Sequence, residues 1–235
     1  MIAESGPRTI LTAALIAALC AACASGQSGQ SGQSGQSGQS GKSVPEVTHD
    51  GLQLVPHSAM ERTWVKPGED FSQYSRVGLL DCFVAFKKHW QLNHPTMRTY
   101  DMNRIKKGLA EEFRKAFTKE LEKGGYPIAT GSGKGVLLVR PAIIDLDITA
   151  PDTGSDVSSI TFTASAGSMA LYVELYDSVS NEILARAVDR RAARHIGDVE
   201  ITSISTNTDD ARRLMEHWAD LLVGKLDEVH GKQSD

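Results

Sequence analysis

The amino-acid sequence predicts an α+β fold, in which two amphipathic helices pack on one face of a mainly antiparallel sheet. Three patterns lead to this prediction: a strand-like run before the first helix, three strand-like runs between the helices, and a four-residue apolar repeat in each helix. Strands joined by short turns pair antiparallel, whereas the run before the first helix can join the sheet in parallel through a right-handed crossover.

The first half of the folded part contains one strand and the clearest helix. Residues 44–73 are punctuated by Pro and Gly, which predicts an extended arm with turns. Residues 76–86 are apolar at both alternating positions, which is typical of a central strand. Residues 103–123 form the predicted helix, because one apolar stripe recurs along it: Ile105, Leu109, Phe113, Phe117 and Leu121.

The second half supplies the remaining strands and the last helix. Residues 136–148 alternate with apolar side chains at the even positions, and Pro141 suggests a bulge or an edge. Residues 169–176 and 183–191 form a predicted hairpin around the turn "DSVSNE". Residues 209–229 repeat the helical pattern, and the Ser/Thr-rich segment 151–167 is interpreted as a mobile hairpin of unassigned role.

The first 22 residues have the organisation of a secretory signal. Arg8 gives a positive amino-terminal region, and an apolar run of about eleven residues follows from Ile10 to Cys20. This run is too short to span a bilayer as a helix. Small residues then precede Cys23, as signal cleavage requires. We therefore expect residues 1–22 to be removed on export.

The stretch "CAAC" (Cys20 to Cys23) resembles the bacterial lipobox, although Cys20 stands where that motif usually has Leu. The resemblance implies a diacylglyceryl thioether on Cys23, followed by cleavage and acylation of the new amino group. Several acyl chains make a lasting membrane anchor, whereas one chain is marginal. Ala24 replaces the Asp that would signal inner-membrane retention, which favours the periplasmic face of the outer membrane. The alternative is a plain signal cut nearby, which releases a soluble protein.

A repetitive spacer follows the leader. Gly26 to Ser43 reads "GQSGQSGQSGQSGQSGKS" and has no apolar residue to seed a core. A coil of 18 such residues spans about 23 Å on average and about 60 Å when extended. We predict three parts: the signal at 1–22, the lipidated cysteine and flexible spacer at 23–47, and one α+β domain at 48–235.

Composition excludes some function classes. The net charge of −4 and the isoelectric point near 6.0 argue against nucleic-acid binding, which needs a clustered basic face. Cys20 leaves with the signal and Cys23 is expected to be lipidated, so only Cys82 stays free and no internal disulfide is expected. It lies among Leu80, Val84 and Phe86, which indicates a small core residue rather than a nucleophile.

Four motifs partly resemble catalytic or ligand-binding sites. "GSGKG" (Gly131 to Gly135) lacks the first glycine and the following helix of a phosphate-binding loop, which leaves a turn as its interpretation. "TASAG" around Ser165 lacks the first glycine of a nucleophile elbow. His89 and His94 flank Trp90 in a loop, without a metal-binding spacing.

Asp145 and Asp147 are the remaining candidates for chemistry. They stand two residues apart on a predicted strand, which puts them about 6.5–7 Å apart on one face. This spacing suits an acid/base pair or a metal. The competing interpretation is an exposed face paired to arginines such as Arg186 or Arg190 on a neighbouring strand.

Two blocks, "TWVKPGEDFSQYSRVGL" and "YVELYDSVSNEILARAVDRR", resemble the signature regions of an uncharacterised family of Gram-negative lipoproteins with a domain of unknown function. The matching residues are Trp64, Pro67, Gly68, Tyr74 and the pattern Glu174, Asp177, Ser178 and Leu184. The similarity covers roughly residues 51–229. It implies an envelope location and a fold, but no chemistry.

Together these observations favour a non-enzymatic, lipid-anchored module of the cell envelope, without cofactor or metal. Its partners are the membrane and an envelope protein, which an exposed strand edge or aromatics such as Trp64, Trp90 or Tyr172 would engage. The sequence does not determine the partner's identity or the oligomeric state. The alternative is a periplasmic hydrolase or metal-dependent enzyme that uses Asp145 and Asp147.

Overall fold

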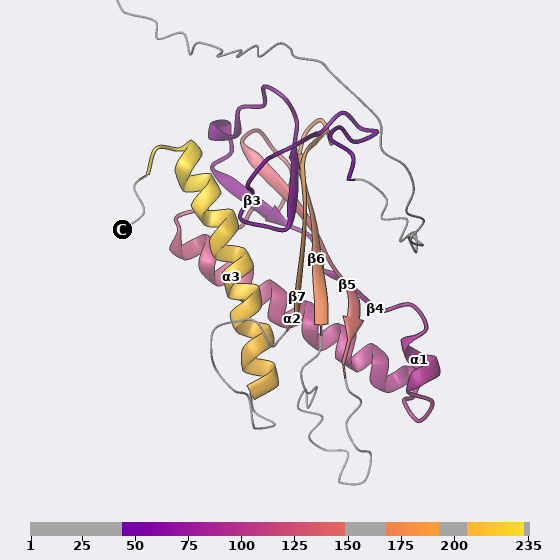
Figure 1. Ribbon diagram of the computed structural model, residues 1–235. Coiled ribbons are helices and arrows are strands. Elements are labelled where there is room, and N and C mark those ends of the chain that lie inside the picture. The colour runs from indigo at the N-terminus through magenta and orange to yellow at the C-terminus, as the bar shows by residue number, and fades with distance from the viewer. Residues whose placement is uncertain (1–43, 149–167, 193–205, 233–235) are drawn as a thin grey trace, which may run out of the picture. The chain divides into compact units, whose positions relative to one another are not determined.

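A mixed sheet covered on one face by two long helices forms the core of the protein (Figure 1). The computed structural model describes residues 44–148, 168–192 and 206–232, without side chains for 191–192 and 206–210. The described strands are β1 (Gln53–Leu54), β2 (Arg62–Val65), β3 (Arg76–Leu79), β4 (Phe83–Phe86), β5 (Val136–Asp147), β6 (Ser168–Asp177) and β7 (Ile183–Ala192). The helices are η1 (Phe71–Gln73), α1 (Trp90–Asn93), α2 (Thr99–Lys123) and α3 (Thr206–Val229).

The strand order confirms the predicted fold class. The strands run β1-β2-β7-β6-β5-β3, and β4 also pairs with β5. Along the path β1-β2-β7-β6-β5, each neighbouring pair is antiparallel. In contrast, β3 and β4 pair with β5 in parallel. The sheet is therefore mostly antiparallel, with its parallel part produced by the expected crossover through α2.

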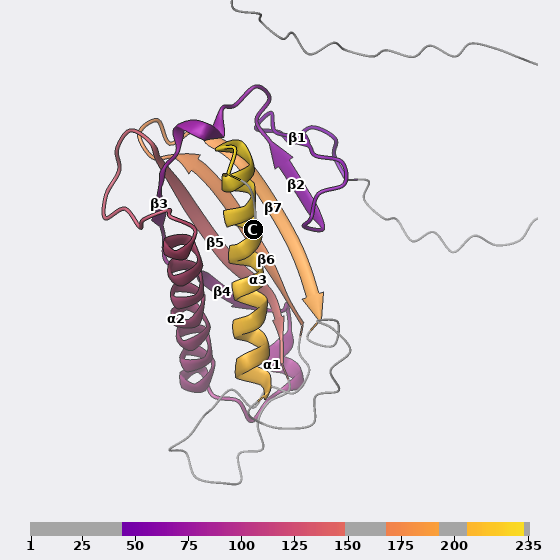
Figure 2. The ribbon, with the colours of Figure 1, turned by 90° about the vertical axis from the view of Figure 1, so that its left-hand side faces the viewer.

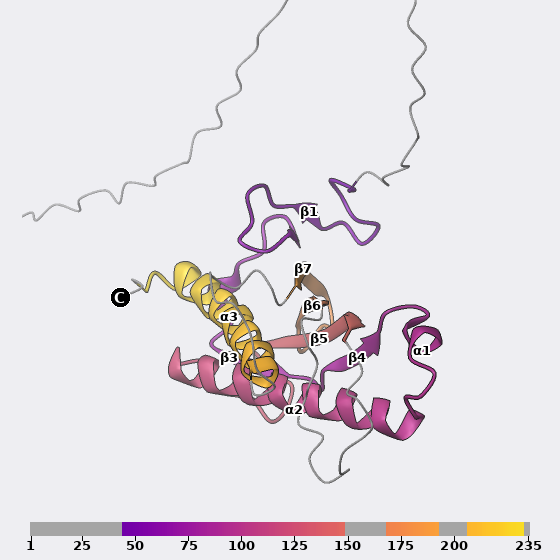
Figure 3. The same cartoon turned by 60° about the horizontal axis from the view of Figure 1, so that its bottom comes forward.

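The two long helices lie on the same side of the sheet (Figure 3). The apolar stripe of α2 is buried, and the rings of Phe113 and Phe117 stack with centroids 3.9 Å apart. In α3, Leu214, Met215, Trp218, Ala219 and Leu226 are buried. Polar pairs join the exposed sides of the helices, such as Lys119 with Glu216 at 2.9 Å.

Pro141 lies opposite a break in the neighbouring strand. The predicted strand 76–86 is divided into β3 and β4, which pair with β5 up to Val139 and again from Ala142. Proline has no N–H to offer a second neighbour, so pairing on that side stops at Pro141. The break turns Leu80 outward, where it is 40% exposed, and not onto the buried face of Cys82 as predicted.

Two further predictions about the strands were wrong. The arm 44–73 contains β1 and β2, and β2 pairs with β7. In β5, residues of both parities are buried, and the most buried are the odd positions Leu137, Val139 and Ile143, because the helices cover that face. The predicted hairpin at 151–167 lies outside the described residues.

Candidate functional site

An apolar groove lies beside α3 and is lined by residues of β2 and β7. Figure 2 shows where these elements lie. It has a volume of about 400 Å³. Its floor is the helix-facing side of the sheet, one wall is α3, and the other wall is the loop 55–60 together with β2. We call this cavity the α3 groove; its apolar lining includes Val55, Met60, Val65, Phe71, Val173, Leu175, Ala185, Ala187, Leu221, Leu222, Leu226 and Val229.

The groove exists because two helices cannot cover the whole sheet. The path from β1 to β3 has five interstrand spacings, or about 24 Å. Two packed helices cover about 20 Å at most. With α2 over β3 and β4, as the Arg114 contact to the Leu79 carbonyl (3.2 Å) shows, α3 reaches β7 through Trp218, and the strip over β2 lies beyond both helices (Figure 2).

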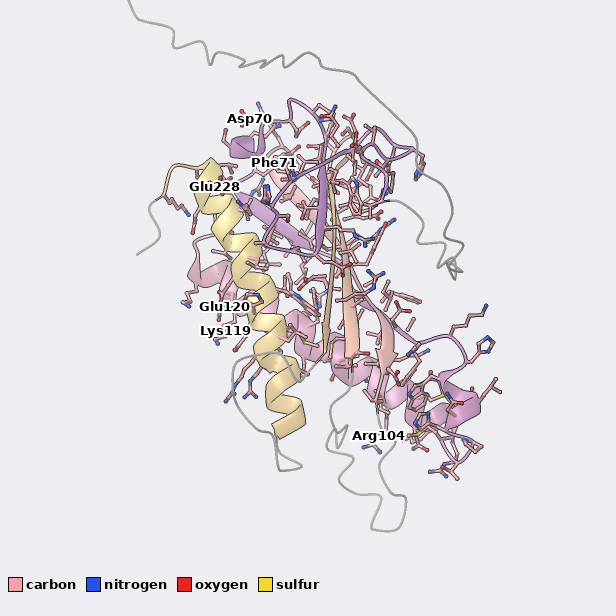
Figure 4. The ribbon with its side chains drawn as sticks, in the orientation of Figure 1. Asp70, Phe71, Arg104, Lys119, Glu120 and Glu228 are labelled. Carbon is pink, nitrogen blue, oxygen red and sulfur yellow. The ribbon has the colours of Figure 1, made fainter. Side chains whose placement is uncertain are left out.

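Apolar side chains at this strip stay partly exposed. Val229 at the carboxyl end of α3 is 42% exposed and Val55 is 37% exposed. Leu221 and Leu222 are only half-buried, although both lie on the groove side of α3. Phe71 and Glu228 mark the end of the groove near η1 (Figure 4).

A buried carboxylate holds the two walls of the groove together. Asp189 on β7 is 2% exposed and accepts a hydrogen bond from the Trp218 indole N–H at 2.8 Å. It also accepts one from the Glu61 backbone N–H at 3.1 Å. Trp218 belongs to α3, and Glu61 directly follows the loop 55–60. The Asp189 side chain therefore positions both walls, which keeps the groove preformed.

The opposite face of the sheet carries a polar cluster around Glu174. Arg140 and Arg186 flank Glu174 in register on β5 and β7, and Tyr172 and Tyr176 lie two residues away on the same face of β6. Both tyrosine hydroxyls donate to the Glu174 carboxylate, at 2.7 and 2.8 Å. Arg186 donates to it from Nε at 3.0 Å and from a terminal nitrogen at 2.9 Å, and Arg140 also donates. We call these five residues the Glu174 cluster.

The cluster holds its carboxylate ionised. Burial alone would raise the pKa of Glu174, but the hydrogen bonds from Tyr172, Tyr176 and Arg186 and the charge of Arg140 lower its pKa below the ordinary value. Burial and the adjacent carboxylate raise the pKa of Tyr172 to about 12, so its hydroxyl stays a donor at neutral pH.

Arg186 also fastens the amino-terminal arm to the sheet. Its two terminal nitrogens donate to the Asp50 carboxylate at 3.2 and 2.6 Å, which lowers the pKa of Asp50 to about 2. Trp64 of β2 is 7% exposed, and its indole N–H donates to the Pro45 carbonyl at 3.0 Å. On this face of the sheet, which no described helix covers and which we call the open face, the charged side chains of the cluster are therefore paired within the protein. Trp64 is buried there and is not an exposed anchor.

Asp145 and Asp147 do not form the predicted strand-face pair. A bulge interrupts the register between Ile144 and Asp147, and Asp145 adopts a positive φ of 53°. Asp147 binds Lys87 at 2.9 Å, whereas Arg186 and Arg190 bind Glu174 and Glu61. The prediction of pairing to arginines was therefore wrong, because the bulge turns this end of β5 toward the segment after β4.

The two loop histidines lie in different environments: His89 is exposed, whereas His94 packs against Trp90. The rings of Phe86, Trp90 and His94 stack in sequence, with centroid distances of 4.3 and 4.1 Å. His94 Nδ1 lies 2.9 Å from the Trp90 carbonyl oxygen, and Trp90, 3% exposed, donates from its indole to the Ile148 carbonyl. Trp90 is thus not an exposed anchor. In the described ranges, no three His, Cys, Asp or Glu side chains gather at metal-binding distance.

The other sequence candidates are accounted for individually. The turn 131–135 leads into β5, and the Ser178 hydroxyl bonds to the N–H and carbonyl of Gly133 at 3.1 and 3.0 Å. Cys82 is buried, and burial raises its pKa to about 12, which makes it unreactive as a thiolate. Cys23 and Ser165 lie outside the described residues. No described helix is long and apolar enough to cross a membrane.

Sequence reasoning missed both regions. A signal for the Glu174 cluster was present: the pattern "YVELY" puts one carboxylate between two tyrosines on a single strand face. A weaker signal for the groove is the adjacent Leu221 and Leu222, which widen the apolar stripe of α3. The identity of the strands beneath them required the structure.

Comparison with protein families matches residues 47–222 to the family described as "Protein of unknown function (DUF3313)". The chain belongs to this family. The DUF3313 match includes both walls of the groove except the end of α3, and the whole Glu174 cluster. No curated protein matches the chain.

Solved structures resemble this DUF3313 protein only distantly. The PelC dodecamer from Paraburkholderia phytofirmans (space group P6) is 11% identical, with 74% of this chain and 97% of PelC covered at a TM-score of 0.37. A point variant of the same dodecamer (space group C2) has the same identity and coverage at a TM-score of 0.36. A putative neuraminyllactose-binding hemagglutinin homolog from Helicobacter pylori is 14% identical, with 69% and 91% covered at a TM-score of 0.33.

Proposed function

We propose that this protein is a membrane-anchored lipoprotein on the periplasmic face of the outer membrane, and that its domain is a non-catalytic binding or assembly module. The α3 groove carries the binding part of the proposal. A preformed, partly open cavity of about 400 Å³ lies in the size range of small-molecule sites, about 300–1,000 Å³, and is apolar as those sites are.

The candidate catalytic groups give no support to the hydrolase alternative. Asp147 is neutralised by Lys87, and His94 is packed against Trp90. The buried Glu174 is surrounded by four donors of its own chain, so its oxygens are occupied. The groove, in contrast, presents apolar surface to solvent, which favours binding over chemistry.

The anchor is supported by the lipobox-like "CAAC" and by the spacer after it. The mature protein, purified from envelopes in detergent, is expected to carry diacylglyceryl and acyl groups on Cys23 by mass spectrometry, and to fractionate with the outer membrane. Cys23→Ser is expected to lose both properties. Cys20→Leu is the matched control and should keep them, because Cys20 leaves with the signal. A bare amino terminus on the wild-type protein would refute the anchor.

The binding site is tested separately on the mature Cys23→Ser protein. The dye 1-anilinonaphthalene-8-sulfonate is expected to bind in a saturable manner, with increased fluorescence. Leu222→Trp should abolish this binding, because Leu222 lines the groove from α3. Leu92→Trp, at a 75% exposed position on α1, should not. Equal dye binding by the three proteins would refute the groove as a ligand site.

A further inference from the structure

Most polar side chains that line the α3 groove are paired within the protein. The hydroxyls of Ser58 and Thr63 lie 2.6 Å apart, and Lys225 binds Glu228 at 2.5 Å. Arg186 is held by Asp50 and Glu174, and apart from His57 the rest of the lining is mainly aliphatic or aromatic. A ligand with polar groups along its length, such as a sugar or an extended peptide, would lose hydrogen bonds to water and regain few here. The lining therefore selects for hydrocarbon.

The size of the groove suits an alkyl chain better than a partner helix. An α-helix is about 10 Å across, whereas a single alkyl chain is much thinner. A cavity of about 400 Å³ lies at the small end of the range for ligand sites, which suits one such chain.

The chain that leads out of the structure indicates where such a hydrocarbon comes from. The described residues begin at Val44, and the Pro45 carbonyl is bonded to Trp64 on β2, the strand that forms one wall of the groove. From there an 18-residue spacer leads to the vicinity of Cys23. The sequence predicts an average span of about 23 Å for this spacer, and about 60 Å at full extension. This step rests on the proposed function: a lipid on Cys23 would hold the groove within reach of a bilayer.

We propose that the α3 groove binds one alkyl chain of a membrane-derived, single-chain amphiphile, such as a fatty acid or a lysophospholipid. The chain lies between α3 and the strands β2, β6 and β7, where it covers Leu222, Leu175 and Ala187. The head group stays in solvent beyond the groove. Lys225 pairs with Glu228, and Arg186 pairs with Asp50 and Glu174, so the charged side chains of the lining are neutralised and the site is indifferent to the charge of the head group.

The test uses mature Cys23→Ser protein, which has no acyl chain of its own to compete. A dansylated undecanoic acid is bound first and then displaced by saturated fatty acids from octanoic to palmitic acid. Affinity is expected to rise by up to about fourfold with each added methylene, and to level off once the groove is full. The fatty alcohol and the lysophosphatidylcholine of the same chain length should bind within a few-fold of the acid.

Variants locate the site. Leu222→Trp is expected to weaken the dansyl probe at least tenfold, and Leu92→Trp to leave it unchanged, with folding checked by circular dichroism. Val229→Glu, at a 42% exposed rim position that tolerates substitution, serves as a second blocking variant. The proposal is overturned if affinity does not depend on chain length or if neither variant reduces it.

Other occupants give different results, each of which overturns the proposal. A dimer that Leu222→Trp dissociates, with no probe binding, would assign the groove to a second copy. Probe binding to Cys23→Ser but not to the lipidated wild type, with both proteins in the same detergent at the same concentration, would assign it to the protein's own acyl chain. If Leu222→Trp abolishes dye binding but affinity does not depend on the chain length of the fatty acid, the amphiphile proposal is refuted and the proposed binding module still stands. A bare amino terminus would sink only the anchor.

Discussion

The two faces of the sheet differ in the side chains that the same strands present to them. On β6, Leu171, Val173 and Leu175 point toward the helices and contribute to the α3 groove, whereas Tyr172, Glu174 and Tyr176 point away and form the Glu174 cluster. The helix face is apolar and incompletely covered. The open face is polar and completes its hydrogen bonds internally.

This difference shows where the molecule can accept a ligand. On the open face, four donors already satisfy one carboxylate, so a ligand would have to break charged hydrogen bonds to enter. On the helix face, a ligand would cover exposed apolar surface at a gain of about 25 cal/mol per Å². Rigidity and binding capacity are therefore divided between the two faces.

The largest effect is expected from the helix face. Trp218→Ala removes a buried indole and the N–H that Asp189 accepts, and should lower the free energy of unfolding by about 3–5 kcal/mol in urea denaturation. Trp218→Phe keeps a ring but not the N–H, and should cost clearly less. If both variants lose the same stability, the Asp189 bond rather than the packing positions α3.

On the open face, Glu174→Gln should lower the free energy of unfolding by about 3 kcal/mol, because it leaves Arg186 beside a neutral amide in a buried setting. Glu182→Gln is the control, since Glu182 lies on the same hairpin in an exposed pair with Lys66. Probe binding in the groove should be unchanged by Glu174→Gln. A loss of binding would show that the two faces are coupled, and would break the comparison.

The smallest effect is a pH dependence confined to the open face. The folded-state pKa of Glu174 lies below its ordinary value of 4.5, so its contribution is complete above that pH and is lost as pH falls through the folded pKa. Tyr172 behaves oppositely: its contribution is complete below pH 10.0 and is lost as pH rises through about 12.

The stability difference between wild type and Glu174→Gln should accordingly be constant at neutral pH and shrink when both are unfolded in urea at pH 3. The difference between wild type and Phe113→Leu provides the reference from the helix face, because Phe113 is buried and stacks on Phe117. A gap for Glu174→Gln that stays constant down to pH 3 would contradict the proposed role of the ionised carboxylate.

The sequence alone predicted the elements whose hydrophobic pattern lies within one short stretch of the chain. The stripe of α2, the pattern of α3 and the hairpin of β6 and β7 are each encoded within about 25 residues. The pairing of β2 with β7 was missed, because Trp64 lies opposite Arg186, more than a hundred residues away. Four residues with mixed polarity give no strand signal until that partner is known.

The candidate site was less predictable than the fold. The groove depends on how far two helices extend across a sheet, and no single stretch of sequence encodes this. The bulge at Asp145 changed the predicted geometry of Asp145 and Asp147 through one residue in an unusual conformation. The Glu174 cluster combines three strands, although its central "YVELY" was visible.

The divided strand opposite Pro141 has a consequence for the behaviour of the protein at high local density. A long, straight, unpaired strand edge would let neighbouring molecules zip together by backbone hydrogen bonding. Here the border is cut into two four-residue pieces, so β4, with Phe83 64% exposed, presents too short a template for such growth. Pro141 thereby shortens the strand edge that is available for intermolecular pairing.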